Sequence, residues 1–245
     1  CHFTLGAEPA ERPRTMATGG LVASQAGREL VQHAQRWFRS PRGKATRIIL
    51  GSSSKVRRKL MDELCEEVGF KYDVLTADID EKAIRREDPA ELVTVLAQAK
   101  ADAIQGKMAP AEKEKDENAL LITCDQVVVH EGKILEKPED AAEARRFIEG
   151  YARAPCSTVG SIAVTQLASG KVAQEVDRAD IHFTPIPAAT IDALIAEGEV
   201  FWCAGGLMVE HDLVTPHVTR IDGTMDGVMG LPKLKVLQLI STFFD

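Results

Sequence analysis

The chain has 245 residues, of which 44% are apolar and 27% charged, and its formal net charge is −7. These values fit a globular chain with a substantial core and exclude the disordered and fibrous classes. No apolar run reaches the roughly 18 residues of a membrane span, so the sequence predicts no membrane partner. An acidic chain is a poor general binder of nucleic acid, and its local basic clusters favour a small polyanion instead.

The first 45 residues are predicted to be a disordered extension of a single domain over residues 46–245. Arginines outnumber acidic residues in this extension, as in organelle transit peptides. A gene start placed upstream of Met16 is another explanation. Residues 28–39 have the pattern of a short amphipathic helix. We expect a cytoplasmic protein, with organelle targeting by residues 1–45 as the alternative.

The cysteines lack the spacing of a zinc site or of a disulfide framework. There are five, an odd number, and no two of them are separated by only two residues. Reduced, mostly buried thiols are therefore the simplest interpretation.

The first half of the domain is predicted to alternate strands with helices. Residues 47–50 form an apolar strand that ends at Gly51, and residues 72–75 form the next strand. The helix between them ends at Gly69 and has an apolar stripe at a spacing of four residues. A second helix begins near Pro89, which suits a first helical turn. The stripe of the first helix consists of Val56, Leu60, Leu64 and Val68.

The second half begins with a charged loop over residues 108–118, which is followed by a strand over residues 120–124. This strand is expected to carry Asp125 at its C-terminal end, before a separate hairpin. Further strands and helices then follow, so we predict an α/β or α+β fold with a mixed sheet. These predicted elements are the hairpin 127–135, a helix 140–148, strands 157–166 and 171–183, a helix 188–197, a glycine-rich connection 203–206, more strands and a helix from residue 233.

Two segments are candidates for phosphate binding. Three serines, residues 52–54, follow Gly51 and precede a helix that begins with basic residues. A helix N-terminus offers free N–H groups to an anion, and Arg can bind two phosphate oxygens. An ordinary serine cap on a solvated basic helix is the alternative. Lys137, held before Pro138, could neutralise phosphate or be simply solvated.

Carboxylates supply the candidates for catalysis and metal binding. Asp125, followed by Gln126, can ligate Mg²⁺ or act as a base, because ligands of α/β sheets gather beyond the strand ends. The acidic segment 78–81 includes Glu81 and could bind metal or be a solvated loop. A glycine pair at 205–206 allows close backbone approach ahead of Glu210. The nearby His211 and His217 have no recognised metal-ligand spacing.

In combination and order, these segments resemble the Maf family of nucleotide pyrophosphatases. The similarity covers about residues 47–242. It rests on IILGSSSKVRRK in the segment 48–69, DIDE at 78–81, LAQAKADAI at 96–104, LITCDQVVVHEGKILEKP at 121–138, CAGGLMVEH at 203–211 and DGVMGLP at 226–232.

The resemblance implies an elongated α/β protein, often dimeric, with a cleft between two lobes of a mixed sheet. It implies hydrolysis of nucleoside triphosphates to monophosphate and pyrophosphate with a divalent metal, Mg²⁺ or Mn²⁺. By similarity, Asp125 is the proton acceptor and Glu81 the second acid at the metal. Ser53 and Arg58 belong to the phosphate-binding turn, and Lys100 and Lys137 are lysines of the cleft.

Three positions of the family line the base pocket, and here they are Arg57, Gln126 and Glu210. The sequence resembles the subgroup that prefers 7-methyl-GTP, since Asp125 is followed by Gln126 and the third position is Glu. A Glu could pair with the N1–H and amino group of a guanine, which thymine cannot offer. The alternatives are a dTTP, UTP or CTP pyrophosphatase of the same family, or a non-catalytic nucleotide-binding regulator of cell division.

The sequence departs from the family pattern at two places. Lys55 and Val56 replace a hydroxyl residue and a proline in the phosphate-binding turn. A Ser-Gly-x-x-His motif is replaced by residues 152–156, which lack the His and end in Cys156. These changes bear on substrate preference and rate more than on the type of reaction.

Overall fold

The computed structural model describes residues 21, 24–108 and 118–244. Residues 1–20 and 22–23 of the possible transit segment 1–45 and most of the predicted loop 108–118 lie outside these residues. The described helices are α1 Gln25–Arg39, α2 Pro41–Ala45, α3 Lys55–Val68, α4 Pro89–Lys107, α6 Ala141–Gly150, α7 Ala188–Glu197, α8 Met225–Val228 and α9 Lys233–Ser241. Short 3₁₀ helices are η1 Glu81–Ala83, η2 Glu199–Trp202, η3 Ala204–Gly206 and η4 Thr215–His217.

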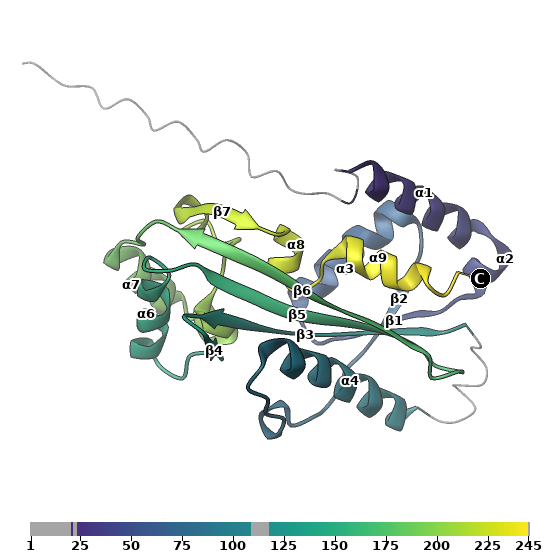
Figure 1. The fold of residues 1–245 in the computed structure, drawn as a ribbon, viewed down its shortest axis with the longest axis horizontal. Helices are drawn as coiled ribbons and strands as arrows, with labels where there is room; N and C mark the ends of the chain where they lie inside the picture. The colour runs from purple at the N-terminus through teal and green to yellow at the C-terminus, as the bar shows by residue number, and fades with distance from the viewer. Residues whose placement is uncertain (1–20, 22–23, 109–117, 245) are drawn as a thin grey trace, which may run out of the picture.

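Within the described residues, seven strands form one open, mixed sheet in the order β2-β1-β3-β5-β6-β7, with β4 paired to β3 outside this path (Figure 1). This arrangement confirms the predicted mixed α/β class. The β2-β1-β3 pairs are parallel, and the remaining pairs are antiparallel. The strands are β1 Ile48–Gly51, β2 Tyr72–Leu75, β3 Leu120–His130, β4 Lys133–Leu135, β5 Cys156–Gln166, β6 Val172–Phe183 and β7 Val218–Asp222.

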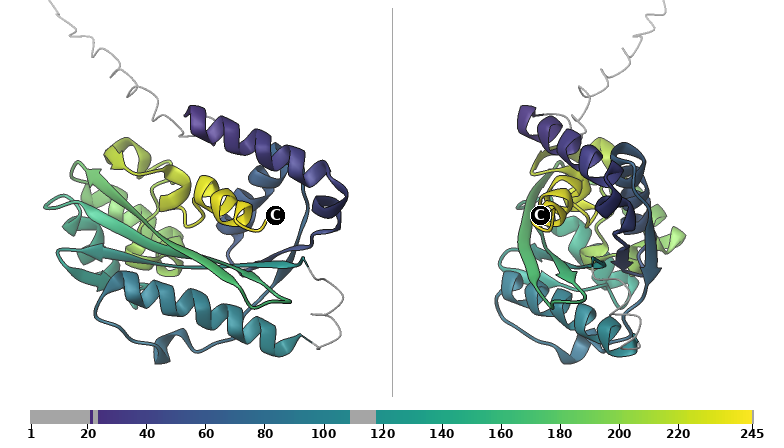
Figure 2. Two further views of the ribbon diagram at one scale, coloured as in Figure 1. Left: turned by 45° about the vertical axis from the view of Figure 1, so that its right-hand side comes forward. Right: turned by 90° about the vertical axis from the view of Figure 1, so that its right-hand side faces the viewer.

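Helices cover both faces of the sheet, and alternate residues of β1 and β3 point to opposite sides. Ile49 and Leu121 pack against α4, whereas Leu50 and Ile122 belong to the cluster that contains α3 and α9. Figure 2 shows α4 on one side of the strands and α1 and α9 on the other. Burial on both faces explains why these strands are continuous apolar runs in the sequence.

The face opposite α4 carries two separate apolar clusters, one at each end of the long strands. The first contains residues of α1, α3 and α9, and the second contains residues of α6, α7 and η2. Cys124 belongs to the first and Val128 to the second, so the boundary between the lobes falls on β3 at Gln126. The predicted division into two lobes has its physical basis in these two clusters.

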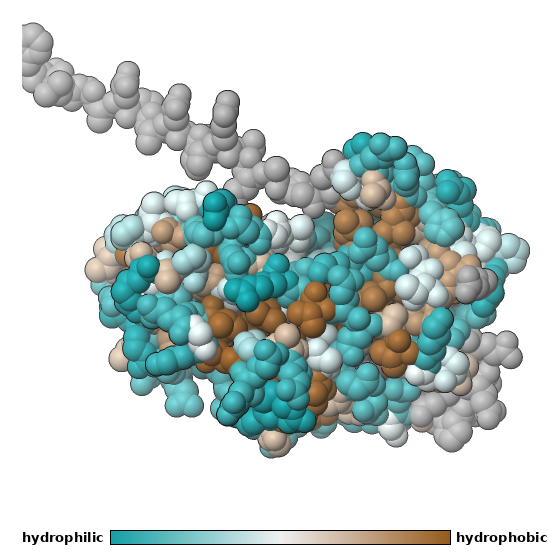
Figure 3. All heavy atoms as spheres, in the orientation of Figure 1, coloured by the Kyte–Doolittle hydropathy of each residue, from teal (hydrophilic) through white to brown (hydrophobic). Residues whose placement is uncertain are grey.

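The described part of the N-terminal segment confirms the amphipathic helix predicted over residues 28–39 and corrects the expectation of disorder for residues 25–45. Residues 25–39 form α1, whose buried face includes Val31, Ala34 and Phe38. Phe38 stacks on Phe70 with their ring centroids 4.5 Å apart. In Figure 3, apolar side chains lie where α1 meets the rest of the molecule, and hydrophilic ones cover its outer surface. This part of residues 1–45 folds because its apolar stripe finds a matching surface on α3 and α9.

We expect Phe38→Ala to lower the free energy of unfolding by about 3 kcal/mol, the usual effect of deleting a buried aromatic side chain. Urea titration followed by circular dichroism measures the change. Gln32→Ala is the matched control, because Gln32 lies on the exposed face of the same helix. Equal stabilities for the two variants would contradict the packing of α1.

None of the helices in the described part of the chain is long and apolar enough to cross a membrane.

Candidate active site

The candidate site is built where β3 loses its partners on one side. β1 pairs with β3 only as far as Thr123, and β4 pairs with it only from Val128 onwards. Between them, residues 124–127 of β3 pair with β5 alone among the described strands. We call this stretch of Cys124, Asp125, Gln126 and Val127 the strand gap. Five residue steps separate its two limits, which corresponds to about 17 Å of extended chain.

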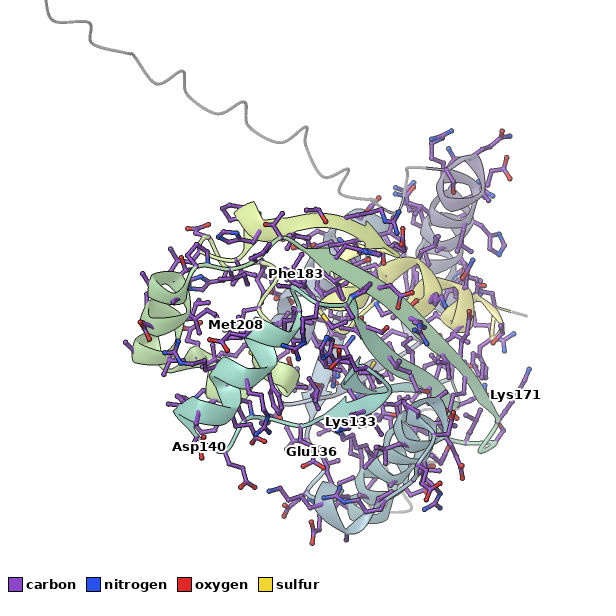
Figure 4. All side chains as sticks on the ribbon, turned by 60° about the vertical axis from the view of Figure 1, so that its left-hand side comes forward. Lys133, Glu136, Asp140, Lys171, Phe183 and Met208 are labelled. Atoms are coloured by element: carbon purple, nitrogen blue, oxygen red, sulfur yellow. The ribbon has the colours of Figure 1, made fainter. Side chains whose placement is uncertain are left out.

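The chain leaves β1 and β4 at the two ends of this gap. The turn Ser52–Ser54 follows the C-terminus of β1, and Glu136 with Lys137 follows the C-terminus of β4. Figure 4 labels Lys133 on β4 and Glu136 just beyond it. Polar residues that follow two strand ends therefore border the strand gap from opposite sides. Ligands of α/β sheets bind beyond the C-terminal ends of strands in this way.

Asp125 itself does not end a strand, which corrects the prediction of a strand over 120–124 followed by a separate hairpin. β3 runs unbroken from Leu120 to His130 because β5 pairs with it over that whole length. What ends near Asp125 is the neighbouring β1, since Gly51 is the partner of Thr123. Asp125 therefore lies beyond the end of the parallel part of the sheet.

Asp125, Lys100 and Glu81 form one ionic cluster on the α4 face. Lys100 Nζ of α4 lies 2.5 Å from Asp125 Oδ1 and 2.9 Å from Glu81 Oε1. Asp125 and Lys100 are only 7% and 9% exposed, whereas Glu81 in η1 has a half-exposed side chain. The ammonium compensates the buried carboxylate, whose charge would otherwise be costly to bury.

The donor atoms of these carboxylates decide which kind of metal site they can form. Asp125 and Glu81 provide oxygen only, and both direct an oxygen at one cation, the Lys100 ammonium. Mg²⁺ needs just one or two carboxylates when waters and substrate phosphates complete its shell. The described residues include no cluster of three or more His, Cys, Asp or Glu suited to a metal. The donor set therefore fits a metal shared with substrate and does not form a complete protein cage.

The predicted phosphate-binding turn is the N-terminus of α3. Ser54 caps this helix, and its Oγ accepts a hydrogen bond from Arg57 N. The first turn of α3 carries no acidic side chain. Ser53 is exposed, and Arg58 donates to the Ser53 carbonyl at 3.4 Å. Free N–H groups, the helix dipole and basic side chains together make this end attractive to phosphate.

Arg57 and Gln126 lie on the opposite face from Asp125 and meet at residues 227–230, where α8 ends in a turn. Arg57 donates to Cys124 O at 2.9 Å and to Gly230 O at 3.0 Å. Gln126 Nε2 donates to Gly227 O at 2.8 Å. Both side chains thus fix the turn 227–230 beside the strand gap. The sequence prediction missed this role of Gly227 and Gly230, although they belong to the quoted motif DGVMGLP.

Glu210 and Lys137 are exposed, and the described hydrogen bonds and ion pairs do not join them to Arg57 or Gln126. Their charges act on the Cys203 thiol. Burial chiefly raises the pKa of Cys203 to about 11, Glu210 and Glu199 add to the rise, and Lys137 opposes it. Glu136 accepts a hydrogen bond from Gly205 N at 2.8 Å, which holds the glycine-rich connection beside the exit from β4.

The cysteine within the gap is not a nucleophile. Burial raises the pKa of Cys124 to about 11, although the neighbouring Arg57 and Lys100 favour the thiolate. The thiol is therefore protonated at neutral pH and chemically inert. Among the described residues of the gap, Asp125 is the group available for proton transfer.

The fold and the site define an α/β protein with a carboxylate–lysine cluster next to a basic helix N-terminus. The family model described as Maf-like protein matches residues 47–243, so the chain belongs to the Maf-like family.

Curated relatives agree with this assignment. The chain is 37% identical to a 7-methyl-GTP pyrophosphatase of Dictyostelium discoideum, over 79% of this chain and 95% of the relative. It is 31% identical to a protein of the same name from Idiomarina loihiensis, over 80% and 93% of the two chains. It is 34% identical to a dTTP/UTP pyrophosphatase of Chromobacterium violaceum, over 81% and 95%.

Proposed function

We propose that this protein is a nucleoside triphosphate pyrophosphatase that releases pyrophosphate from nucleotides, with 7-methyl-GTP as its preferred substrate. The main structural support is the ionic cluster beside the N-terminus of α3, in which Lys100 bridges Asp125 and Glu81. Relatives named 7-methyl-GTP pyrophosphatase support the substrate preference.

Asp125 is the proposed proton acceptor. Its carboxylate, which lies 2.5 Å from the Lys100 ammonium, can orient a water and take its proton. That water attacks the α-phosphorus, the bond to the β-phosphate oxygen breaks, and pyrophosphate leaves. The nucleoside monophosphate is the second product.

The triphosphate is proposed to lie along the strand gap. Ser53, Arg58 and the free N–H groups of α3 bind it from the β1 side. Lys137 approaches from the β4 side. The positive charges of Arg58 and Lys137 offset the negative charge that develops on the leaving pyrophosphate in the transition state, where electrostatic stabilisation has its largest effect.

A divalent cation, Mg²⁺ or Mn²⁺, is proposed to bind between Asp125, Glu81 and the substrate phosphates. When bound, it would polarise phosphoryl oxygens and neutralise charge on the leaving pyrophosphate. Lys100 then keeps both carboxylates directed at the same place.

Base selection is proposed to come from Arg57 and Gln126 through the turn 227–230, and from Glu210 on the opposite side of the gap. The second candidate substrate class is dTTP and UTP, because a relative with that name is also 34% identical. A homodimer is a further prediction from the family resemblance.

A nucleotide panel tests the proposal. We expect purified protein with Mg²⁺ or Mn²⁺ to release pyrophosphate, and not orthophosphate, most rapidly from 7-methyl-GTP. GTP, dTTP, UTP and CTP are measured alongside, with the two phosphate products read separately. Fastest turnover of dTTP or UTP would favour the second candidate. Tight binding without turnover of any nucleotide would instead indicate the non-catalytic regulator.

A further inference from the structure

Trp202 is an exposed aromatic side chain in the lobe that also carries Glu210, the proposed base-binding acid. It is 78% exposed, whereas the other exposed large apolar side chains of the described chain reach only 36–39%. The second tryptophan, Trp37, behaves differently and stacks on Phe244 with ring centroids 4.2 Å apart. A large aromatic surface left in water at a candidate site is available for a ligand.

The backbone around Trp202 is held on both sides. Val200, two residues before it, is fully buried. Three residues after it, Gly205 donates from its N–H to Glu136 O and accepts a hydrogen bond from Tyr151 Oη at 2.6 Å. The exposure of Trp202 therefore comes from a fixed segment and not from a frayed end, and the segment is tied to the exit from β4.

Glu210 lies on a turn that is tied to the segment preceding Trp202. His211 Nε2 lies 2.9 Å from Glu197 Oε2, and Glu197 is the last residue of α7 before η2. On the other side of Glu210, Val209 is buried and its carbonyl accepts a hydrogen bond from Thr215 Oγ1 at 2.9 Å. Glu210 is therefore presented from a supported turn in the same lobe as Trp202.

The charges around this segment suit a purine with positive character. Glu199 is in η2 with Trp202, and it acts with Glu210 on the Cys203 thiol that follows. Guanine methylated at N7 carries a positive charge on its ring, and it is attracted both to acidic side chains and to the face of an indole. A neutral pyrimidine has a smaller ring and gains less from either contact.

We propose that Trp202 is the stacking platform for the substrate base and thereby selects cationic, N7-methylated purines, with Glu210 at the edge of the stacked ring. This inference rests on the proposed pyrophosphatase function and adds a specificity-determining residue to it. Stacking holds the base and leaves the reacting phosphates untouched, so it affects KM far more than kcat.

The test compares Trp202→Ala, Trp202→Phe and the control Leu213→Ala, which removes another exposed apolar side chain of the described chain. We expect Trp202→Ala to raise KM for 7-methyl-GTP about tenfold, since stacking of one base contributes a factor of this order. KM for UTP should change less than threefold. The Phe variant should be intermediate, and the control should match the unmodified protein.

Tryptophan fluorescence provides a readout that does not depend on turnover. Titration with 7-methyl-GMP should quench the unmodified protein more than GMP does, and Trp202→Phe should lose this quenching while Trp37 still reports. If no nucleotide is hydrolysed, the proposed function fails, yet the titration still decides whether Trp202 stacks on the base. Unchanged kinetics in Trp202→Ala together with absent quenching would overturn the inference alone. A change from dimer to monomer in Trp202→Ala, measured by light scattering, would also overturn it by assigning Trp202 to a subunit interface.

Discussion

Asp125→Asn should lower kcat for pyrophosphate release about a thousandfold, within the usual contribution of a positioned general base. The amide keeps the shape of the carboxylate but cannot accept the proton of the attacking water. It also removes the negative charge that lies 2.5 Å from Lys100 Nζ. Lys100 keeps Glu81 as an ionic partner, so the loss of charge is partly compensated. The variant is therefore expected to fold and to bind nucleotide while failing at the chemical step.

The measurement is pyrophosphate release from 7-methyl-GTP under saturating substrate, with urea unfolding on the same samples. Asp102→Asn is the matched control, because Asp102 lies on α4 two residues from Lys100 but is exposed to solvent. The control should keep full activity. Full activity in Asp125→Asn would sink the catalytic assignment, provided that 7-methyl-GTP is hydrolysed at all.

The sequence was sufficient to predict the elements whose burial pattern is strong. The apolar runs of β1 and β3 and the striped helices α3 and α4 are confirmed, since each signal is local to its own segment. The extent of β3 was beyond local reasoning. Asp125 and Gln126 interrupt the apolar run and look like a strand end, yet pairing with β5 keeps the strand intact through them.

The sequence predicts which residues belong to the site but not which residues they bind through hydrogen bonds and ion pairs. The family resemblance identifies Asp125, Lys100 and Glu81 as site residues. That both carboxylates pair with the Lys100 ammonium depends on the tertiary structure. Arg57 could be expected to face a ligand. Its actual acceptors include Gly230 O, which lies 173 residues along the chain, and no local pattern predicts such a contact.

The expectation of disorder over residues 25–39 fails for a different reason. Its helical stripe was visible, but the surface that receives it is formed by α3 and α9, from both ends of the domain. An amphipathic helix of this length is marginal alone, so its folding depends on that surface. The matched relatives extend little beyond the aligned region, since this region makes up 93% to 95% of the two 7-methyl-GTP pyrophosphatases. The family pattern therefore gave no guidance there.

Gly205→Ala is expected to destabilise the protein by about 4 kcal/mol, because two independent costs act at this position. Gly205 has φ +63°, where a side chain is strained. An added Cβ would also lie 2.4 Å from Tyr151 Oη and 3.0 Å from Val128 Cγ1. Tyr151 could turn away only by losing its buried hydrogen bond to Gly205 O, which leaves polar groups unpaired.

Gly170→Ala separates the two costs. Gly170 has a similar φ of +69°, but a Cβ there would have nothing within 4 Å. This control should therefore lose only about 1 kcal/mol, the cost of the left-handed backbone. Urea unfolding of both variants gives the difference, and equal losses would show that the packing at Gly205 is looser than the contacts imply. Gly205 N–H also binds Glu136 O, so its displacement should move the turn that carries Lys137. A rise in KM should consequently accompany the loss of stability in Gly205→Ala and be absent in Gly170→Ala, because only the first position connects the lobe of α6 and α7 to the strand gap.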